Sequence, residues 1–238
     1  NIFMKIIIIA DVIIIMIVII YFVVMLKKGK AEAKRQIDDF VSRNPTKILT
    51  EKQKHNLLYG AILFKNTFES PLDFFPEMRI DQYAYTLKDS WGIANTEQAK
   101  ETLDELLSLK TSIKLDAFIS DNDISVEQDE IAKQLELSID KVKEVTTTYA
   151  WDLNRAILVA EWCYFCEYIT YDVAWSYINK AAAMAIERGK DWSDYTISLC
   201  LGRMLHGFGL DDTLVNGIQK LFTSSNPSES LFKVYKFK

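Results

Sequence analysis

The sequence predicts an all-α fold, in which one N-terminal transmembrane helix precedes a compact multi-helix cytoplasmic domain. Residues 6–26 form an apolar run that contains a single charged side chain. Only 4 prolines and 8 glycines occur in 238 residues, so few positions interrupt a helix. Beyond the apolar run, hydrophobic residues recur at helical spacing, and no alternation of apolar and polar residues indicates a strand.

The apolar run at 6–26 is long enough to cross a membrane, and residues 1–5 form a short tail before it. At about 1.5 Å per residue, a helix over this run would be about 31 Å long. Lys27, Lys28 and Lys30 follow the run, whereas a single lysine precedes it. Because cytoplasmic flanks carry the excess of basic residues, we expect the C-terminal part to lie in the cytoplasm. The same lysines suit anionic lipid headgroups.

Asp11 is the charged residue inside this run, about 7–8 Å along the helix from its start. We expect it to reach water at the interface or to pair with Lys5, since a charge costs less away from the bilayer centre. The alternative is pairing with a basic residue of a partner helix. Ala31-Glu32-Ala33 resembles a signal-peptide cleavage site, but the apolar run exceeds the about 7–15 residues typical of such peptides. An uncleaved anchor is therefore favoured.

The part of the chain after the anchor is long enough for one ordinary domain or two small ones, and we expect a single domain. The sequence divides there into a basic juxtamembrane linker with a short helix at 27–50, an all-α domain at 51–223 and a polar C-terminal tail at 224–238. The whole chain has a formal charge of −5, and the lysines beside the membrane leave the domain more acidic still. An acidic domain repels phosphate backbones, which argues against nucleic acid as the main partner.

Three helix start signals recur in the domain. Residues 50–53, 95–98 and 125–128 each place Thr, Asn or Ser three positions before Gln, the pattern of a capping box or a close variant. Apolar residues follow each signal at helical spacing, and Pro71 and Pro76 mark a break between helices. We expect about nine or ten short helices after the anchor.

Residues 127–145 have the apolar spacing of a helix-turn-helix. Ile131 and Leu135 would pack the first helix and Val142 the second. DNA reading needs basic or amide side chains on the exposed face, and this segment carries six acidic residues against three lysines. A plain helical hairpin is therefore favoured, and a membrane-bound DNA-binding regulator is the weaker hypothesis.

Three cysteines occur, and their pattern predicts no metal site. Cys163 and Cys166 form a Cys-x-x-Cys inside an aromatic helical run, while Cys200 stands alone. A structural zinc site needs four ligands, and the two histidines, His55 and His206, lie far apart in sequence. We expect all three to be core cysteines of a reduced protein.

Polar residues cluster on two aromatic-rich helices. Asp152 and Arg155 stand three apart next to Trp151, so they share a helix face and can form an ion pair. A later helix carries Trp192 and runs to Arg203. We predict that these five residues form either a buried ion network that organises the fold or a pocket for an anion or partner. The sequence leaves both open.

The second half of the chain resembles a bacterial protein family. The motifs are Trp151-Asp152-Leu153-Asn154-Arg155-Ala156, Glu161-Trp162-Cys163-Tyr164, Ala174-Trp175, Trp192-Ser193-Asp194-Tyr195, Gly202-Arg203 and, upstream, Ser90-Trp91-Gly92-Ile93 before Leu103-Asp104-Glu105-Leu106-Leu107. Their order and spacing are similar to those of the family of unknown function DUF1266, the YbeU/YbeR-like proteins. The resemblance spans residues 55–208, with signature blocks at 90–107 and 149–207.

The resemblance implies an all-α bacterial fold and, together with the anchor, a place in the bacterial inner membrane. It implies no activity. The family tends to have glycine or another small residue where this chain has Glu167, and residues 121–148 resemble a variable connector.

Two further classes of function stand beside DNA binding. A membrane-tethered module that binds a protein partner needs only the anchor and an aromatic-rich helical domain; an accessory or immunity protein of a bacterial toxin or secretion system would be one form. A hydrolase or transferase with a site near Asp152, Arg155 and Arg203 is the alternative. However, Glu161 falls on the opposite helix face from Asp152, and Glu167 lies far along the axis. Without a catalytic triad, phosphate-binding loop or zinc motif, we expect no cofactor and predict the binding module.

Overall fold

The computed structural model describes residues 2–67 and 69–238, with side chains from residue 14 onward. Every regular element in those ranges is a helix and none is a strand, which confirms the all-α prediction. The elements are α1 (Ile2–Arg43), α2 (Glu51–Leu57), the 3₁₀ helix η1 (Leu58–Gly60), α3 (Ala61–Asn66), α4 (Ile80–Trp91), α5 (Thr96–Leu107), α6 (Lys110–Asp121), α7 (Ser125–Gln134), α8 (Ile139–Lys143), α9 (Tyr149–Phe165), α10 (Tyr171–Arg188), α11 (Trp192–Leu205), α12 (Asp212–Thr223) and α13 (Leu231–Val234).

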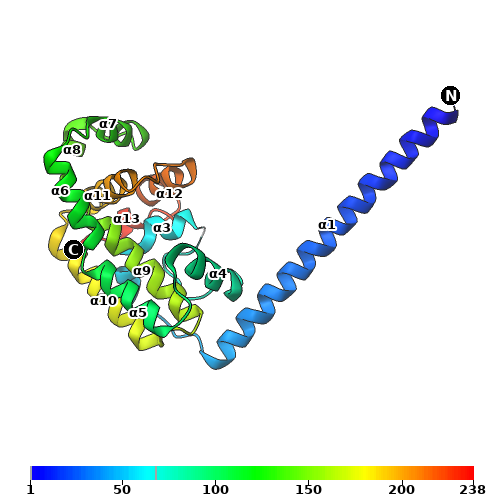
Figure 1. The fold of residues 1–238 in the computed structure, drawn as a ribbon, viewed down its shortest axis with the longest axis horizontal. Helices are drawn as coiled ribbons and strands as arrows, with labels where there is room; N and C mark the ends of the chain where they lie inside the picture. The colour runs from blue at the N-terminus through cyan, green and yellow to red at the C-terminus, as the bar shows by residue number, and fades with distance from the viewer. Residues whose placement is uncertain (1, 68) are drawn as a thin grey trace.

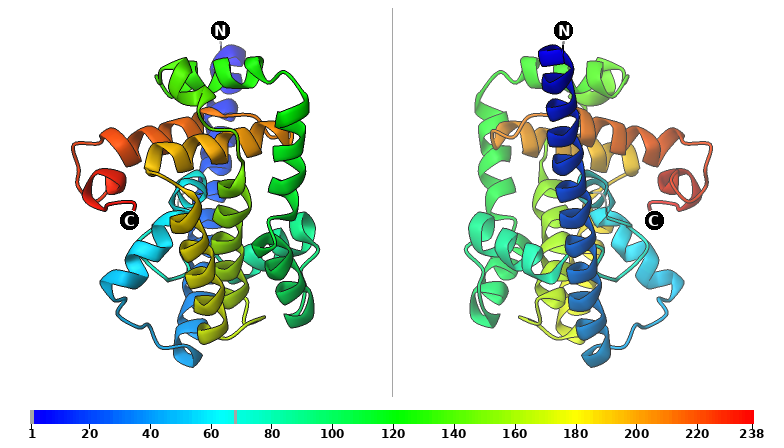
Figure 2. Two further views of the ribbon diagram at one scale, coloured as in Figure 1. Left: turned by 90° about the vertical axis from the view of Figure 1, so that its left-hand side faces the viewer. Right: turned by 90° about the vertical axis from the view of Figure 1, so that its right-hand side faces the viewer.

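Helix α9 is the centre of the domain. All of its residues are buried, and it contacts α3, α4, α5, α6, α10, α11 and η1. Helix α10 folds back along it, as the left view of Figure 2 shows. A helix enclosed on all sides must be apolar nearly all round, and the run Ala-Ile-Leu-Val-Ala at 156–160 meets that requirement. The polar residues of α9 are therefore buried as well and need partners.

Helix α1 extends from the domain as a long rod (Figure 1). The sequence suggests a linker from residue 27, whereas the structure continues one helix through Arg43 and leaves only 44–50 as the connection to α2. The last turns of the rod dock on the domain, where Phe40 is buried with its ring centroid 5.3 Å from that of Tyr164. The Gln36 amide donates to the Asp81 carboxylate at 3.1 Å.

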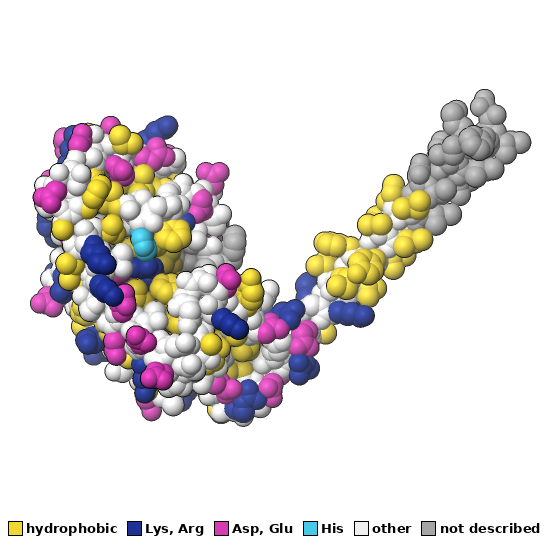
Figure 3. All heavy atoms as spheres, in the orientation of Figure 1, with side chains coloured by type: hydrophobic (Ala, Val, Ile, Leu, Met, Phe, Trp, Pro, Cys, Tyr) yellow, Lys and Arg dark blue, Asp and Glu magenta, His cyan; other side chains and the backbone are white. Residues whose placement is uncertain are grey.

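The hydrophobic side chains of residues 14–26 are exposed along this rod (Figure 3). Among the residues that the structure describes, no helix has the length and apolar character needed to span a bilayer. The first part of the predicted span, residues 6–13 with Asp11, lies outside the described side chains. Lys27, Lys28 and Lys30 follow on the same helix and are exposed.

Glu167 fastens the end of the rod to the end of α9. Its carboxylate accepts hydrogen bonds from Arg43 Nη2 at 2.9 Å, Arg43 Nε at 3.1 Å and Asn44 Nδ2 at 2.8 Å. The backbone of Glu167 has φ of 58°, the left-handed conformation that favours glycine after a helix. This conformation explains the small residue expected here from the family resemblance, and the bonds to α1 explain what a glutamate adds.

Two of the three start signals form as predicted. Thr50 and Gln53 make a capping box at α2, and the Asn95 side chain caps α5 by accepting from the Gln98 backbone N–H. The third signal also marks a helix start, since α7 begins at Ser125, but its capping box does not form and Ile124 supplies no side-chain cap. The Asp123 carboxylate accepts from the Ser125 N–H instead, at 2.9 Å.

The segment 127–145 forms the predicted helical hairpin from α7 and α8. Ile131, Val142 and Val145 are buried in it, and Glu136 makes the turn with φ of 54°. The cysteines also lie where the sequence places them: Cys163 and Cys200 are buried and Cys166 is half-buried, all as free thiols. Burial raises the pKa of Cys200 to about 12, so this thiol stays protonated and inert.

Candidate functional site

Asp152 and Arg155 form the predicted ion pair on one face of α9. Arg155 Nη2 donates to Asp152 Oδ1, and Arg155 Nε donates to the Trp151 carbonyl at 3.1 Å. Both side chains are withdrawn from solvent, with Asp152 fully buried and Arg155 8% exposed. A buried charge pair of this kind needs its remaining polar atoms satisfied.

The second oxygen of Asp152 caps another helix. Asp152 Oδ2 accepts a hydrogen bond from the Ser112 backbone N–H at 2.7 Å, in the first turn of α6. That helix begins after Leu109, which supplies no side-chain cap, so its first N–H groups need partners from elsewhere. Both Asp152 oxygens are thus occupied by the protein itself.

A neighbouring network ties α6 to the start of α9. Ser112 Oγ donates to the Thr148 carbonyl at 2.8 Å, and the Thr148 N–H and hydroxyl both donate to Asp116 Oδ1, at 2.7 and 2.8 Å. Burial raises the pKa of Asp116, and these two donors oppose the shift. Asp152 therefore connects α9 to α6 through a buried hydrogen-bond network.

Arg155 has a second, outward-facing environment. Its guanidinium carbon lies 4.3 Å from the Trp151 ring centroid and 5.6 Å from that of Trp91, at the C-terminus of α4. Both distances fall in the cation–π range. Gly92 follows Trp91 with φ of 68° and ends α4 there, which accounts for the Trp-Gly pair in the motif. Within the described residues, Arg155 Nη1 has no hydrogen-bond partner.

His206 and Phe208 complete the surroundings of Trp151. Trp151 Nε1 donates to His206 Nδ1 at 3.1 Å, so the neutral imidazole carries its proton on Nε2. Burial and the positive charge of Arg155 lower the pKa of His206, which keeps it neutral at pH 7. Phe208 is 60% exposed, and its ring centroid lies 5.8 Å from that of Trp151.

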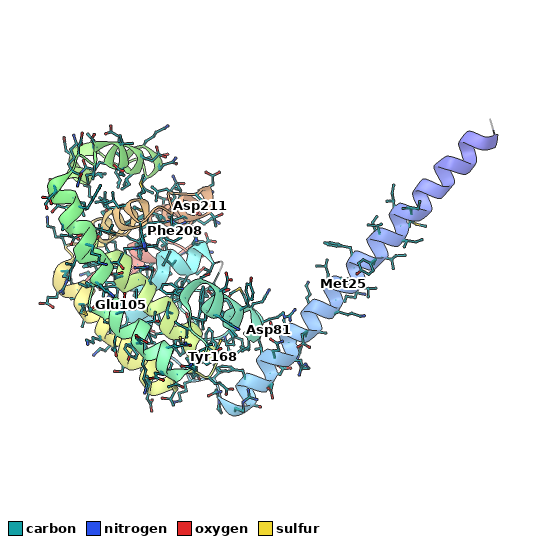
Figure 4. All side chains as sticks on the ribbon, in the orientation of Figure 1. Met25, Asp81, Glu105, Tyr168, Phe208 and Asp211 are labelled. Carbon is teal, nitrogen blue, oxygen red and sulfur yellow. The ribbon has the colours of Figure 1, made fainter. Side chains whose placement is uncertain are left out.

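We define the Arg155 site as Trp91, Trp151, Arg155, His206 and Phe208. It lies where the C-terminus of α4, the N-terminal half of α9 and the turn after α11 meet. Figure 3 shows basic and hydrophobic side chains gathered around a histidine on this face, and Figure 4 places Phe208 there.

Arg203 does not join the Asp152–Arg155 pair. It holds the turn that carries His206 and Phe208, because Arg203 Nε donates to the Gly209 carbonyl at 2.7 Å and Nη2 to Asp211 Oδ2 at 2.9 Å. Gly209 adopts φ of 66°, which lets the turn close. Arg203 thus acts at the border of the Arg155 site, with its guanidinium 5.8 Å from the Phe208 ring centroid.

Gly202, the other half of the Gly-Arg motif, lets α11 approach α9. A Cβ atom built on Gly202 would lie 2.4 Å from Trp151 Cβ and 3.2 Å from Thr148 Cβ. No side chain fits at that separation. The approach sets the distance between Trp151 and the turn that follows α11.

Trp192 lies outside the Arg155 site. It packs at the other end of α11, stacked on Phe232 with ring centroids 4.1 Å apart, and its Nε1 donates to the Tyr235 carbonyl at 2.8 Å. Tyr59 and Phe237 also contact it. This aromatic cluster fixes the C-terminal segment to the domain.

Buried carboxyls form a second polar cluster, away from Asp152. Glu69 accepts hydrogen bonds from Thr67 Oγ1 and Tyr83 OH, each at 2.7 Å, and from Trp162 Nε1 at 3.1 Å. Glu161 on α9 is fully buried near it, and burial with the charge of Glu69 raises the pKa of Glu161 well above its ordinary value. Among described residues, no three metal-ligating side chains come together.

The site residues that the sequence did not single out are Trp91, His206 and Phe208. Trp91 belongs to one of the family motifs, but its position in the sequence does not indicate that it contacts Arg155 of α9. His206 and Phe208 lie in an irregular turn, where periodicity carries no information. A glycine on either side of Phe208 was the available signal for a built turn.

The fold and the site define a helical domain whose polar centre is an aromatic-framed arginine on a buried helix. The family model described as "Protein of unknown function (DUF1266)" matches residues 86–227, more than half of the chain. The chain therefore belongs to this family, as the motifs indicated, and the whole Arg155 site lies inside the matched region. No curated protein and no solved structure matches the chain.

Proposed function

We propose that this chain is a membrane-tethered module that binds a protein partner in the cytoplasm through the Arg155 site. The observation that carries the proposal is Phe208, an aromatic side chain held exposed by a built turn. Arg203 and two left-handed glycines fix that turn against the domain, at the border of a buried arginine. Protein interfaces are enriched in aromatic residues and arginine at their centres.

The position of the site also supports binding. Trp151 and Arg155 are held by α9, which is enclosed by the domain, so they are fixed before a partner arrives. Phe208 and His206 are exposed above them. Because Trp151 and Arg155 are fixed and buried while Phe208 and His206 are exposed, the site favours docking of another protein surface over enclosure of a small molecule.

The tether is supported by the sequence of residues 6–26 and by the exposed lysines that follow it. Washing isolated membranes with alkaline carbonate tests it. We expect the full-length protein to stay in the membrane pellet and a variant without residues 6–26 to be released. Release of the full-length protein would contradict the tether.

Affinity purification from gently solubilised native membranes tests the binding face. The wild-type chain, Phe208→Ala and Tyr85→Ala would be compared, since Tyr85 is an exposed aromatic residue of α4 outside the site. We expect a stoichiometric partner with the wild type and Tyr85→Ala, and its loss with Phe208→Ala. Equal recovery with all three would reject the Arg155 site as the binding face. The partner's identity would also test the toxin-accessory or immunity role that the sequence led us to expect.

A further inference from the structure

We propose that the Arg155 site takes a carboxylate, the side chain of an aspartate or glutamate that the protein partner presents. This inference rests on the proposed binding function and adds the chemistry of the group recognised. It depends on two hydrogen-bond donors that border the Trp151 indole and on the engagement of the nearby carboxylates by other groups.

The first donor is Arg155 Nη1. Of the three guanidinium nitrogens, Nε donates to the Trp151 carbonyl and Nη2 donates to Asp152. Asp152 contacts the guanidinium through Nη2 only. Nη1 has no partner in the described part of the chain, although the side chain is about nine-tenths buried. An arginine that keeps a free edge offers a charge-assisted hydrogen bond to an incoming acceptor.

The second donor is His206 Nε2. Trp151 Nε1 fixes the tautomer by donating to His206 Nδ1, which places the imidazole proton on the opposite side of the ring. The His206 side chain is exposed, so this N–H is accessible. Arg155 and His206 thus each offer one N–H donor, and a carboxylate has two oxygens that accept hydrogen bonds.

The acids near the site are already engaged. Asp152 is fully buried and uses both oxygens, for Arg155 and for Ser112. Asp211 accepts from Arg203 through Oδ2 and from the Leu214 backbone N–H through Oδ1. Glu105, whose charge also acts on Arg155, pairs with Lys110 at 3.1 Å. These three carboxylates are engaged by other groups, and a partner can supply one for the two donors.

The shape of the site favours a side chain presented by a surface over a free small acid. Phe208 and His206 stand exposed at its edge, and only Arg155 and Trp151 are buried. A free small acid would bury little of its surface at so open a site and would therefore bind weakly, since tight small-molecule sites enclose most of their ligand. An acidic side chain would be placed there by the rest of the partner interface.

Histidine NMR of the full-length protein in detergent tests the proposal. The chain has two histidines, so a sample labelled at histidine Cε1 gives one signal for His206 and one for His55. His55 bonds to the Lys236 carbonyl through Nε2 and serves as the internal control. The probes are a blocked tripeptide with central glutamate, its glutamine counterpart, and sodium acetate as the free acid.

We expect the glutamate peptide to shift the His206 signal saturably, with an affinity at least about tenfold above that of the glutamine peptide. Arg155→Lys should abolish this preference while the His55 signal stays in place. Equal shifts with the two peptides, or none with either, would overturn the carboxylate assignment; a response to acetate alone would overturn the partner side chain as its source. If Arg155→Lys fails to fold, the contrast between the peptides on the wild type still decides.

The two proposals fail separately. Loss of the partner with Phe208→Ala but no glutamate preference would refute the carboxylate and leave the binding function intact. A glutamate preference with full partner recovery by Phe208→Ala would refute the binding face, and the inference with it.

Discussion

Asp152 Oδ2 accepts a hydrogen bond from the Ser112 backbone N–H at 2.7 Å, so a side chain of the central helix α9 caps the neighbouring helix α6. The same carboxylate neutralises Arg155, whose guanidinium faces Trp151 and Trp91. One buried residue therefore links the packing of α6 to the position of the arginine in the candidate site. With the proposed binding function, a change at Asp152 would affect both stability and binding.

Replacing Asp152 should destabilise the domain strongly. Asp152→Ala leaves Arg155 buried without its counter-ion and the α6 terminus without its cap, and we expect the free energy of unfolding to fall by about 3–5 kcal/mol. Urea denaturation followed by circular dichroism measures it. As control, Asp81→Ala removes a half-exposed pair with Arg79 and should cost less than about 1 kcal/mol. Similar losses in both variants would show that the buried network does not organise the fold.

Gly202→Ala should also destabilise the domain, because the added Cβ would lie 2.4 Å from Trp151 Cβ. Overpacking of this kind costs about 1–3 kcal/mol, more than the helix propensity that alanine gains. We expect weaker partner binding as well, since α11 must shift and the turn after it moves. Gly29→Ala is the matched control, as nothing lies within 4 Å of its Cβ position. Unchanged stability of Gly202→Ala in thermal unfolding would contradict this close approach.

The buried carboxyls predict a specific pH dependence. Burial is the main cause that raises the pKa of both Glu69 and Glu161 in the folded state. The folded protein then binds these protons more tightly than the unfolded chain, so their contribution to stability is complete below the unfolded pKa of about 4.3. It is lost as the pH rises through the folded values, so the free energy of unfolding should fall as the pH rises above about 4.3.

Glu161→Gln tests that assignment. We expect the variant to be more stable than the wild type at pH 8 and to show a flatter dependence on pH, because a neutral amide carries no charge to desolvate. Glu101→Gln, at an exposed position of α5, should follow the wild-type curve. A wild-type slope in Glu161→Gln would place the titrating group elsewhere.

Glu167→Gly should loosen α1 without harming the domain. Glycine relieves the left-handed φ of 58°, while the bonds to Arg43 and Asn44 are lost. We expect hydrogen exchange of residues 36–43 to rise about fivefold, the equivalent of about 1 kcal/mol for a surface ion pair. Glu136→Gly relieves a similar φ of 54° in the α7–α8 turn and should leave that exchange unchanged. Equal exchange in both variants would show that Glu167 does not hold α1.

The sequence predicts interactions within single helices, but it does not predict which helices and turns come together in the fold. The Asp152–Arg155 pair follows from a spacing of three within one helix, and the caps at Thr50 and Asn95 follow from short motifs. By contrast, Arg203 was grouped with this pair on its residue type alone. Its partners are Gly209 and Asp211, which the turn after α11 brings to it.

Trp192 shows the same limit. It shares helix α11 with Arg203, yet it packs at the opposite end of that helix on Phe232. The neighbours of each helix end are set by tertiary packing between distant parts of the chain. Residue spacing within one helix does not reveal them. Besides Trp151 on the same helix, the tryptophan that faces Arg155 is Trp91, which is far from it in sequence.

Site-specific photo-crosslinking in native membranes tests the central claim most directly. A photoreactive phenylalanine analogue would replace Phe208, and Phe118, an exposed aromatic residue of α6 outside the site, would be the matched control. We expect one partner protein to be captured from position 208, and none from position 118. Capture from both positions alike, or from position 118 alone, would contradict the Arg155 site as the surface through which this protein acts.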